Sequence, residues 1–347
     1  MPRTGERRRE RLAGATRLEL ATSGVTGRRS NQLNYAPAEK RRPAAQGAPV
    51  GSAATTDCSR CDGGGKTSRR FHRRYDGAIV NGPTGPDIEY DAYGSDELAE
   101  IYDAVYAGRD DGAFWAALAP AEGGILELAC GTGRVLLPLA RAGREVVGLD
   151  LSPAMLARCR AALAAEPAAV REHVRLVQAD MTAFDLGRRF AMVASPFRGF
   201  QHLTGVGDQL ACLGRCHAHL AAGGRLVLDL FNPDPALLYA GGESDGEETA
   251  ETVPWTGGRT IRWWGHVVGY HRARQFNQCE MIYEITEADG TIRRVSERFP
   301  MRYLFRYELE HLLARAGFAI DALYGDYDRS PYDDDSPELI VVARAIA

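Results

Sequence analysis

From about residue 87 onward, short runs of consecutive apolar residues alternate with segments in which apolar residues recur every three or four positions. Short apolar runs are typical of buried strands, and the wider spacing is typical of amphipathic helices. This alternation predicts an α/β fold, a parallel sheet with helices on both faces. The predicted strands are 125–129, 145–149, 174–178, 190–194, 225–230, 318–324 and 338–344, and the predicted helices are 133–142, 153–164, 207–221 and 306–316, after a helical segment that begins at Ser95.

The pattern changes in residues 255–304, where strand-like runs follow one another with turns between them. Asp289-Gly290 is the clearest hairpin signal among these turns. We therefore expect three or four antiparallel strands, inserted after the fifth parallel strand. The pattern as a whole predicts a doubly wound, seven-stranded sheet that carries an inserted antiparallel β cap.

The first 86 residues have no sustained period and are rich in Arg, Gly, Ala, Pro and Ser. Such a composition buries too little apolar surface to offset the entropy of ordering, so we interpret 1–86 as a disordered basic tail and 87–347 as the folded domain. Residues 1–75 hold 17 of the 42 Lys and Arg but only 6 of the 46 Asp and Glu. The predicted domain is therefore acidic, which argues against a nucleic-acid substrate. A basic arm that touches nucleic acid is the alternative interpretation of the tail.

Cysteine usage indicates the redox environment and the prospects for a metal site, and hydropathy indicates whether the chain spans a membrane. The seven cysteines show no disulfide rhythm, so we expect a reducing cytoplasm. Cys58 and Cys61 form the only CxxC pair, and only His72 follows them, so we expect no metal site. No apolar run reaches 18 residues, so we expect no membrane span. We expect the protein to be either a monomer or a homodimer.

The stretch ILELACGTGRVLLPLARAGREVVGLDLSP, residues 125–153, enters a glycine turn between a strand and a helix. Gly131 and Gly133 let a ligand approach the backbone closely. A dinucleotide fingerprint would place its third glycine at 136, where Leu136 stands, and no Gly-Lys-Ser/Thr follows for a phosphate loop. The turn therefore favours a nucleoside without a pyrophosphate.

Three acids surround this turn. Asp150 ends the second strand, where a carboxylate accepts both ribose hydroxyls of a nucleoside. Asp180 ends the third strand, where it can meet an adenine amino group while Met181 packs on the ring. Glu127 adds negative charge near the helix start, which would repel a pyrophosphate and attract a cation. The ligand that fits is a positively charged nucleoside.

The motifs ELACGTGR, VVGLDLSPAML, VQADM and HLAAGGRLVLDL resemble the consecutive motifs of class I, Rossmann-like S-adenosylmethionine-dependent methyltransferases, over roughly residues 88–347. YDAVYAGRDDGAFW, SPFRGFQHL and the β insertion look like small-molecule methyltransferases, among them amino-sugar N,N-dimethyltransferases and glycine-type N-methyltransferases. The resemblance implies S-adenosylmethionine as cofactor and a small-molecule acceptor. It also implies that the last strand of the sheet is antiparallel.

The resemblance assigns the cofactor site residue by residue. Tyr102 would reach the carboxylate end of the cofactor, Asp150 the ribose, and Asp180 with Met181 the adenine. The residues expected around the methionine portion and the rest of the cofactor are Glu127, Ala129, Cys130, Gly131, Gly133, Leu151 and Pro196. Cys130 is a small turn residue here, because no base lies near it in sequence.

Candidate acceptor residues follow the fourth strand and lie in the aromatic segments. His202 is the candidate base that takes a proton from an amine or hydroxyl nucleophile. Arg198 replaces a small residue of the amino-sugar pattern and would either pair with an acidic group of the substrate or point to solvent. Trp115 and Tyr327 are candidate substrate contacts, with sheet or helix core as the alternative.

Three functions remain open at this point. The sequence favours a methyltransferase that moves a methyl group to an N or O atom by in-line displacement. An NAD(P)-binding oxidoreductase is the first alternative, disfavoured by Leu136 and Asp180. A non-catalytic module that binds S-adenosylmethionine is the second.

Overall fold

The computed structural model of the chain describes residues 90–235, 238 and 246–346. The predicted disordered tail, residues 1–86, and the Cys58–Cys61 pair lie outside the described residues. Within the described part of the chain, we find no helix with the length and apolar character needed to cross a bilayer.

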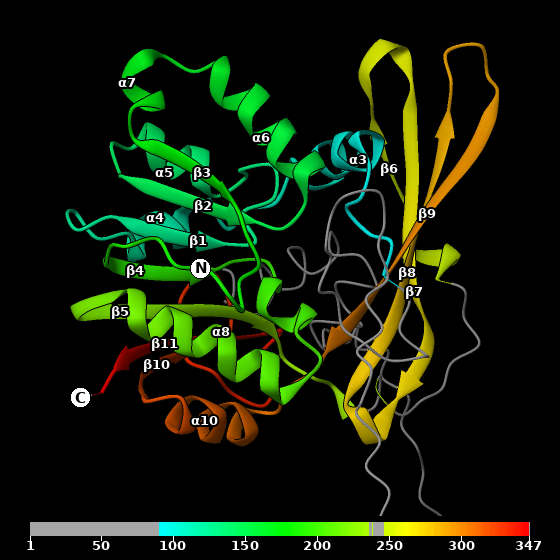
Figure 1. Cartoon of the computed structure of the whole chain (residues 1–347). Helices are drawn as coiled ribbons and strands as arrows, with labels where there is room; N and C mark the ends of the chain where they lie inside the picture. The colour runs from blue at the N-terminus through cyan, green and yellow to red at the C-terminus, as the bar shows by residue number, and fades with distance from the viewer. Residues whose placement is uncertain (1–89, 236–237, 239–245, 347) are drawn as a thin grey trace, which may run out of the picture. The chain divides into compact units, whose positions relative to one another are not determined.

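Seven strands form the main sheet, in the spatial order β10-β11-β5-β4-β1-β2-β3 (Figure 1). Strand β11 is antiparallel to both of its neighbours, β5 and β10, and the remaining pairs are parallel, which confirms the predicted topology. The order reverses between β1 and β4, and ligands of open α/β sheets bind beyond the carboxyl ends of the strands at such a point. The strands are β1 Ile125–Leu128, β2 Val146–Asp150, β3 Val174–Gln178, β4 Phe190–Ser195, β5 Leu220–Phe231, β10 Phe318–Tyr324 and β11 Glu338–Ala345.

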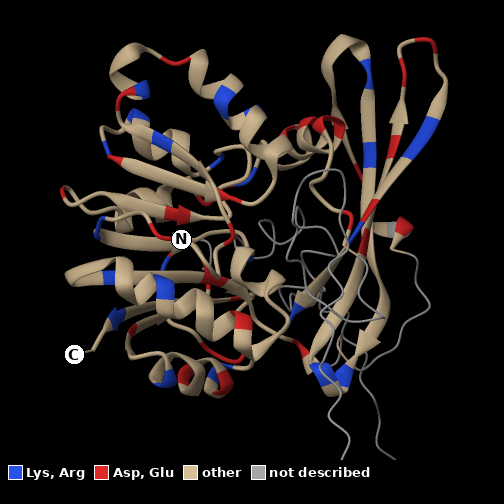
Figure 2. Cartoon of the chain, in the orientation of Figure 1, with Lys and Arg blue, Asp and Glu red and all other residues tan. Residues whose placement is uncertain are grey.

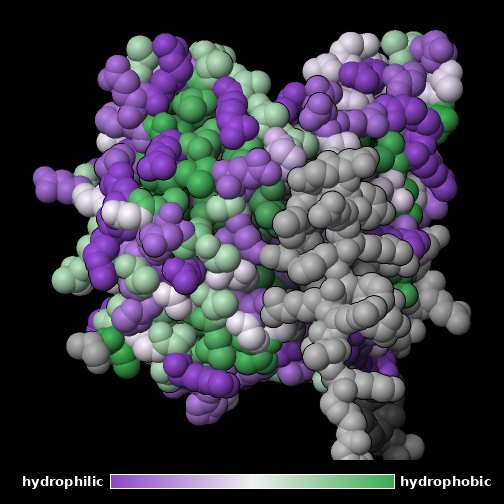
Figure 3. Space-filling view, in the orientation of Figure 1, coloured by the Kyte–Doolittle hydropathy of each residue, from purple (hydrophilic) through white to green (hydrophobic). Residues whose placement is uncertain are grey.

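Helices cover both faces of this sheet. Leu213 of α8 and Leu309 of α10 belong to the core on one face, whereas Leu136 of α5 and Leu156 of α6 belong to the core on the other. On the side drawn in Figure 3, hydrophilic and hydrophobic residues are interspersed, as expected for helices that cover a sheet. The helices are α3 Asp96–Tyr106, α4 Gly112–Leu118, α5 Leu136–Arg141, α6 Pro153–Ala164, α7 Ala168–Arg171, α8 Val206–His219 and α10 Arg306–Arg315.

Some predicted boundaries are wrong, and the helix predicted over 133–142 begins only at Leu136. The helix predicted over 207–221 ends at His219, and β5 begins at Leu220. Leu220 is buried and pairs with Phe190 of β4 before the register shifts to the main part of the strand. The last two residues that helical periodicity assigns to the helix therefore belong to β5, where strand pairing holds them.

The insertion is a separate antiparallel sheet in the order β6-β7-β8-β9. Its strands are β6 Glu251–Pro254, β7 Thr260–His271, β8 Phe276–Thr286 and β9 Ile292–Arg302. Strand β6 lies before the predicted start at 255, because four residues that end in proline carry too little periodicity to be recognised. The hairpin predicted at Asp289-Gly290 is confirmed: Gly290 has φ 84°, and Glu287 N–H donates to the Thr291 carbonyl at 2.8 Å.

The two faces of the insertion sheet differ in polarity. One face packs on Ile101 and Val105 of α3 through Trp263, Met281 and Phe299. On the other face, basic and acidic residues lie side by side, with Glu284 paired to arginines of β7 and β9 (Figure 2). Helix α3, whose first turn is capped by Ser95, therefore lies against the apolar face of the insertion.

Candidate active site

Two glycines of the turn after β1 have different structural roles. Gly131 has φ 54°, and a Cβ added there would meet no atom within 4 Å, so the turn leaves space at this point. Gly133 has φ 91°, and its Cβ would lie 2.7 Å from the Cys159 sulfur, so here glycine is required by packing. Ala129, with φ 51°, begins the turn in the left-handed region.

The structure explains why Leu136 replaces a third glycine. In the dinucleotide fingerprint that glycine allows a helix to approach a strand closely. Here the small residue is on the strand: a Cβ on Gly148 of β2 would lie 2.4 Å from Leu136 Cδ1 and 2.8 Å from the Cys130 sulfur. Cys130 is buried and acts as packing beneath the turn, and burial raises the pKa of its thiol well above the usual value.

Asp150 is positioned at the carboxyl end of β2 beside the glycine turn. Its Oδ2 accepts from Gly131 N–H at 2.7 Å, and its Oδ1 accepts from Ser152 N–H at 2.8 Å. Burial raises the pKa of Asp150, and these backbone hydrogen bonds act in the opposite direction. The adjacent Leu151 is 36% exposed, an apolar surface next to the acid.

Asp180 and Met181 follow β3 at the same edge of the sheet. Asp180 Oδ1 accepts from both the backbone N–H and the hydroxyl of Thr182, each at 2.7 Å. Met181 is partly buried and packs against the core that β1, β4 and α8 share. These contacts fix the acid at the rim of the sheet; its contact with an adenine stays a prediction.

Glu127 is the buried acid of the site. It lies on β1 with 3% exposure, and its Oε2 has no hydrogen-bond partner among the described residues. Burial raises the pKa of Glu127 to about 8; the charge of Arg134 lowers it, and Asp111 and Asp150 raise it further. An unpartnered buried carboxyl oxygen at this edge suits a cationic group of a ligand.

Tyr102 of α3 lines a pocket of about 210 Å³ with Tyr106, Thr132, Gly133 and Arg134. Burial raises the pKa of the Tyr102 hydroxyl, and the charge of Arg134 and a hydrogen bond with it lower that pKa. The pocket joins Tyr102 to the glycine turn and to Pro138 and Arg141 of α5, and the contact of Tyr102 with a cofactor stays a prediction.

Trp115 is buried and has its polar partner inside the protein. Its ring is 1% exposed within the core below α4, and its indole N–H donates to Asp111 Oδ2 at 3.3 Å. Asp111 also binds Arg134, whose Nη2 lies 3.0 Å from the same oxygen. Sequence reasoning placed Trp115 on the substrate; the structure makes it a support for the Asp111–Arg134 pair.

Arg198 and Tyr327 are also hydrogen-bonded inside the protein, and their contact with a substrate stays a prediction. Arg198 is 4% exposed, and its Nη2 donates to both carboxylate oxygens of Glu338 at 2.9 and 3.0 Å. Tyr327 donates its hydroxyl to Asp229 Oδ2 at 2.9 Å and accepts from Arg109 Nη2 at 2.8 Å. The Arg198 guanidinium therefore already has its carboxylate, and it does not point to solvent.

This network holds a strained turn after β4. Pro196 is buried at the end of the strand, and the next two residues, Phe197 and Arg198, have φ 48° and 65°. A left-handed conformation is unfavourable for such residues and persists only where surrounding contacts enforce it. Asp229 supplies those contacts, because its side chain accepts from Phe197 N–H at 2.7 Å and its carbonyl from Arg198 N–H at 3.2 Å.

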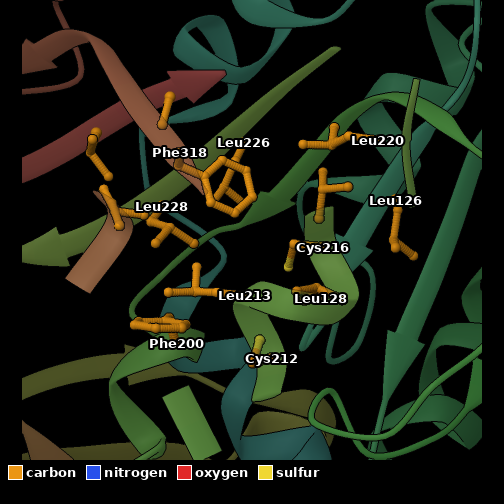
Figure 4. Packing of buried hydrophobic residues seen from close by; sticks show 14 of the residues in the cluster. Leu126, Leu128, Phe200, Cys212, Leu213, Cys216, Leu220, Leu226, Leu228 and Phe318 are labelled. Carbon is orange, nitrogen blue, oxygen red and sulfur yellow. The ribbon is translucent and has the colours of Figure 1, made fainter. Parts of the chain in front are cut away.

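His202 ends the short helix η2, Gly199–His202, that follows this turn. Phe200 anchors η2 in the core beside Cys212, Leu213 and Leu228 (Figure 4). Gln201, the residue before His202, is fully buried: it donates to the Arg302 carbonyl at 2.7 Å and accepts from Phe231 N–H at 3.0 Å. Gln201 thus ties η2 to both sheets.

Three aromatic rings enclose the His202 imidazole. Their centroids lie 5.9 Å away for Tyr90, 5.7 Å for Tyr93 and 5.5 Å for Phe299. Burial lowers the pKa of His202 to about 4, and its Nδ1 has no hydrogen-bond partner among the described residues. The imidazole is therefore neutral near pH 7 and retains a free nitrogen.

Sequence reasoning missed several residues that shape the site. They are Tyr90, Tyr93, Arg109, Asp111, Arg134, Asp229, Glu297, Phe299 and Glu338. A lone acid inside an apolar strand, as in LVLDLF for Asp229, was an available signal, because such acids are buried only with partners. Tyr93, one partner of Glu297, lies 204 positions away, and Arg198, the partner of Glu338, lies 140 positions away, so no local pattern indicated these contacts.

A seven-stranded sheet with an antiparallel edge pair and an acid-rimmed glycine turn defines a Rossmann-like nucleoside-binding protein. S-adenosylmethionine fits this site. The orphaned Glu127 oxygen would accept its ammonium group, and the open space at Gly131 admits a ligand close to the backbone. Gly131 N–H is already bound by Asp150, which leaves no free donor there for a phosphate.

Comparisons with known proteins agree with this geometry. Residues 125–224 match the family model described as a methyltransferase domain. A dTDP-3-amino-3,6-dideoxy-alpha-D-glucopyranose N,N-dimethyltransferase from Streptomyces fradiae is 31% identical over 254 residues, 70% of this chain and 89% of the relative. The structure of the sugar N-methyltransferase KedS8 from Streptoalloteichus is 26% identical, with a TM-score of 0.55 over 76% of this chain and 98% of that chain. A demethylmenaquinone methyltransferase from Thermus thermophilus is 40% identical over 114 residues, 32% of this chain and 48% of the relative.

The chain belongs to the family of class I S-adenosylmethionine-dependent methyltransferases. It is an enzyme that uses S-adenosylmethionine to methylate a small molecule, as the motifs predicted. The oxidoreductase and the non-catalytic module, kept as alternatives on sequence alone, are not supported.

Proposed function

We propose that the chain transfers methyl groups to the amine nitrogen of an amino sugar. The length of the matches supports this assignment. The cofactor turn and the whole insertion lie between Ile125, where β1 begins, and Arg302, where β9 ends. A match of 254 residues is long enough to include both, and a match of 114 residues is not.

The insertion matters because it contributes to the acceptor side. Phe299 of β9 contacts the His202 ring, and the Arg302 carbonyl accepts from Gln201 on η2. A relative that shares the insertion therefore shares the walls of this enclosure as well as the cofactor turn. The match to the sugar dimethyltransferase is long enough to include the insertion, which favours an amine acceptor over a quinone.

Bound S-adenosylmethionine supplies a methyl group on a sulfonium, a leaving group that is already activated. The chain's own contribution is to orient the acceptor, which is worth up to about 7–11 kcal/mol of the barrier when the geometry is productive. We assign the ribose to Asp150, the adenine to Asp180 and Met181, and the ammonium group to Glu127. The residues proposed to complete the cofactor site are Tyr102, Ala129, Cys130, Gly131, Gly133, Leu151 and Pro196.

We assign His202 to the acceptor nitrogen. A neutral imidazole accepts a hydrogen bond from an amine N–H, which directs the nitrogen lone pair away from the histidine. The enclosing rings of Tyr90, Tyr93 and Phe299 exclude water, a competing nucleophile. With a pKa of about 4, His202 is neutral at pH 7 and stays available as a hydrogen-bond acceptor; the proton that the methylated ammonium must lose before the next methylation passes to solvent.

The test is methyl transfer with three acceptors: a nucleotide-activated amino sugar, the same sugar with a hydroxyl in place of the amine, and a quinol. We expect transfer of one and then two labelled methyl groups to the amino sugar alone, measured by mass spectrometry. Methylation of the hydroxyl analogue or the quinol in preference to the amine would overturn the proposal.

A further inference from the structure

Glu297 of β9 is an acid in an apolar environment. It is 3% exposed on the inner face of the insertion sheet, directly opposite Met281 of β8, and Phe299 follows on the same face. A buried carboxylate is costly unless it is hydrogen-bonded, so its partners should reveal what it does.

Each carboxylate oxygen of Glu297 accepts a hydrogen bond. Its Oε1 accepts from the Tyr283 hydroxyl at 2.6 Å, and its Oε2 accepts from Tyr93 N–H at 3.0 Å. The first partner lies on the adjacent strand, and the second lies about 200 residues earlier in the chain, before α3. Glu297 therefore fastens the segment that precedes α3 to the insertion sheet.

The fastened segment, residues 90–95, is under backbone strain. Tyr93 has φ 60°, which is unfavourable for an aromatic residue without compensating contacts. Its N–H is held by Glu297, and its carbonyl accepts from the Ser152 hydroxyl at 2.6 Å. Asp91 N–H donates to the Arg298 carbonyl at 3.0 Å, which adds a second attachment to β9.

These attachments place residues 90–95 between the two ligand sites. Ser152 follows Asp150, the acid assigned to the ribose, and the rings of Tyr90 and Tyr93 flank His202. Tyr93 also stacks on Phe299 at 6.0 Å. All three rings around His202 are therefore fixed relative to the Glu297 carboxylate, either through the segment or through β9.

We propose that Glu297 is a positioning residue for methyl transfer: it holds residues 90–95 so that the tyrosine rings orient His202 and the acceptor nitrogen. This inference rests on the proposed function of the same site. Glu297 itself does not touch the reacting atoms, so its loss should reduce turnover and leave the cofactor site intact.

Kinetics of matched variants test this role in the full-length protein. Glu297→Ala should lower kcat/KM for the amino sugar at least tenfold and leave the dissociation constant of S-adenosylhomocysteine within twofold. Glu297→Gln should recover part of the loss, because its amide oxygen still accepts from Tyr93 N–H, and Tyr283→Phe should fall between wild type and Glu297→Ala. Glu284→Gln, which changes an acid on the opposite face of the same sheet, should behave as wild type.

A second measurement needs no acceptor. In protein labelled with ¹⁵N-histidine, the His202 ring signals are those missing from a His202→Phe variant. Glu297→Gln should shift them, and Glu284→Gln should not. Unshifted signals, or a Glu297→Gln enzyme with wild-type kcat/KM, would overturn the inference. If wild type methylates no amino sugar, the proposed function fails and the ring signals alone decide the role of Glu297.

Discussion

The cofactor side and the acceptor side of the site are built in different ways. On the cofactor side, Gly131 and Asp150 are 19 positions apart and are hydrogen-bonded directly. On the acceptor side, Glu297 binds Tyr93 across 204 positions, and Arg198 binds Glu338 across 140. The cofactor side is formed by consecutive strand-to-helix turns. The acceptor side is formed by segments that are distant in sequence and that come together only in the folded protein.

The difference determines how each side tolerates change. Consecutive turns at one edge of a parallel sheet present similar groups whatever follows them, so the cofactor side can be retained while the acceptor changes. The acceptor side depends on β11, the insertion and residues 90–95 at once. A substitution there should alter transfer without altering cofactor binding, and the reverse should hold at the glycine turn.

The largest effect is expected on the cofactor side. Asp150→Ala removes a carboxylate that holds Gly131 N–H and that we assign to the ribose, so several charge-assisted hydrogen bonds are lost at about 1.5–3 kcal/mol each. The affinity for S-adenosylhomocysteine should fall by about 10³-fold in calorimetry. Asp321→Ala, at an exposed acid of β10, is the control and should bind normally. A loss below threefold for Asp150→Ala would place the nucleoside elsewhere.

On the acceptor side, His202→Phe should lower kcat by about 10²-fold, the usual contribution of a positioned acid–base group. Binding of S-adenosylhomocysteine should change less than threefold, since the rings that the His202 ring contacts, those of Tyr90, Tyr93 and Phe299, are not assigned to the cofactor. Steady-state kinetics with the amino sugar and calorimetry measure the two quantities. Equal losses in both would show that the two sides are not separable.

The lowered pKa of His202 also predicts how the stability of the folded protein depends on pH. This pKa is about 4 in the folded protein and about 6.5 when unfolded, so between these values the unfolded chain binds more protons. Stability should therefore fall as the pH drops below about 6.5. The decrease in Tm between pH 7.5 and pH 5 should be smaller for His202→Phe than for wild type; a decrease of the same size would mean that His202 is not buried as a neutral ring.

The sequence predicted the cofactor side better than the acceptor side, because the residues of the cofactor side are close in sequence and those of the acceptor side are not. The succession of strands and helices, the glycine turn and the acid that ends β2 follow from periodicity and short spacings, and the structure places the turn and the acid together. Arg198 was assigned to substrate because it replaces a small residue of the amino-sugar pattern, and Tyr327 because aromatic residues recur in the insertion and the C-terminal loop. Their partners in the structure, Glu338 and Asp229, lie on strands distant in the chain, and only the sheet topology pairs them.

Glu127 should make cofactor binding depend on pH. Burial holds its pKa at about 8, so the carboxyl is largely neutral at pH 6 and must ionise to receive an ammonium group. An α-ammonium stays charged up to about pH 7.5, so between pH 6 and 7.5 the association constant of S-adenosylmethionine should rise by up to about tenfold per pH unit. Glu127→Gln should flatten the slope. An equal slope for 5′-methylthioadenosine, which lacks the ammonium, would refute this role.

The smallest effect is expected where the two sides touch. A Cβ on Gly199 of η2 would lie 2.8 Å from Ala129 Cβ, at the start of the glycine turn, and 2.9 Å from Ser195 Oγ. Gly199→Ala should therefore cost about 1–3 kcal/mol of stability through overpacking. Gly214→Ala in α8, where a Cβ meets nothing within 4 Å, is the control and should raise stability by about 0.5–1 kcal/mol.

Because Gly199 separates Ala129 from the turn that carries His202, its substitution should displace both. Cofactor affinity and kcat should then fall together and moderately, unlike the one-sided losses of Asp150→Ala and His202→Phe. Thermal unfolding, calorimetry and kinetics of the same preparation measure all three quantities. A Gly199→Ala enzyme with lowered Tm but unchanged affinity and kcat would show that each side keeps its geometry without the other, which would limit the coupling to stability alone.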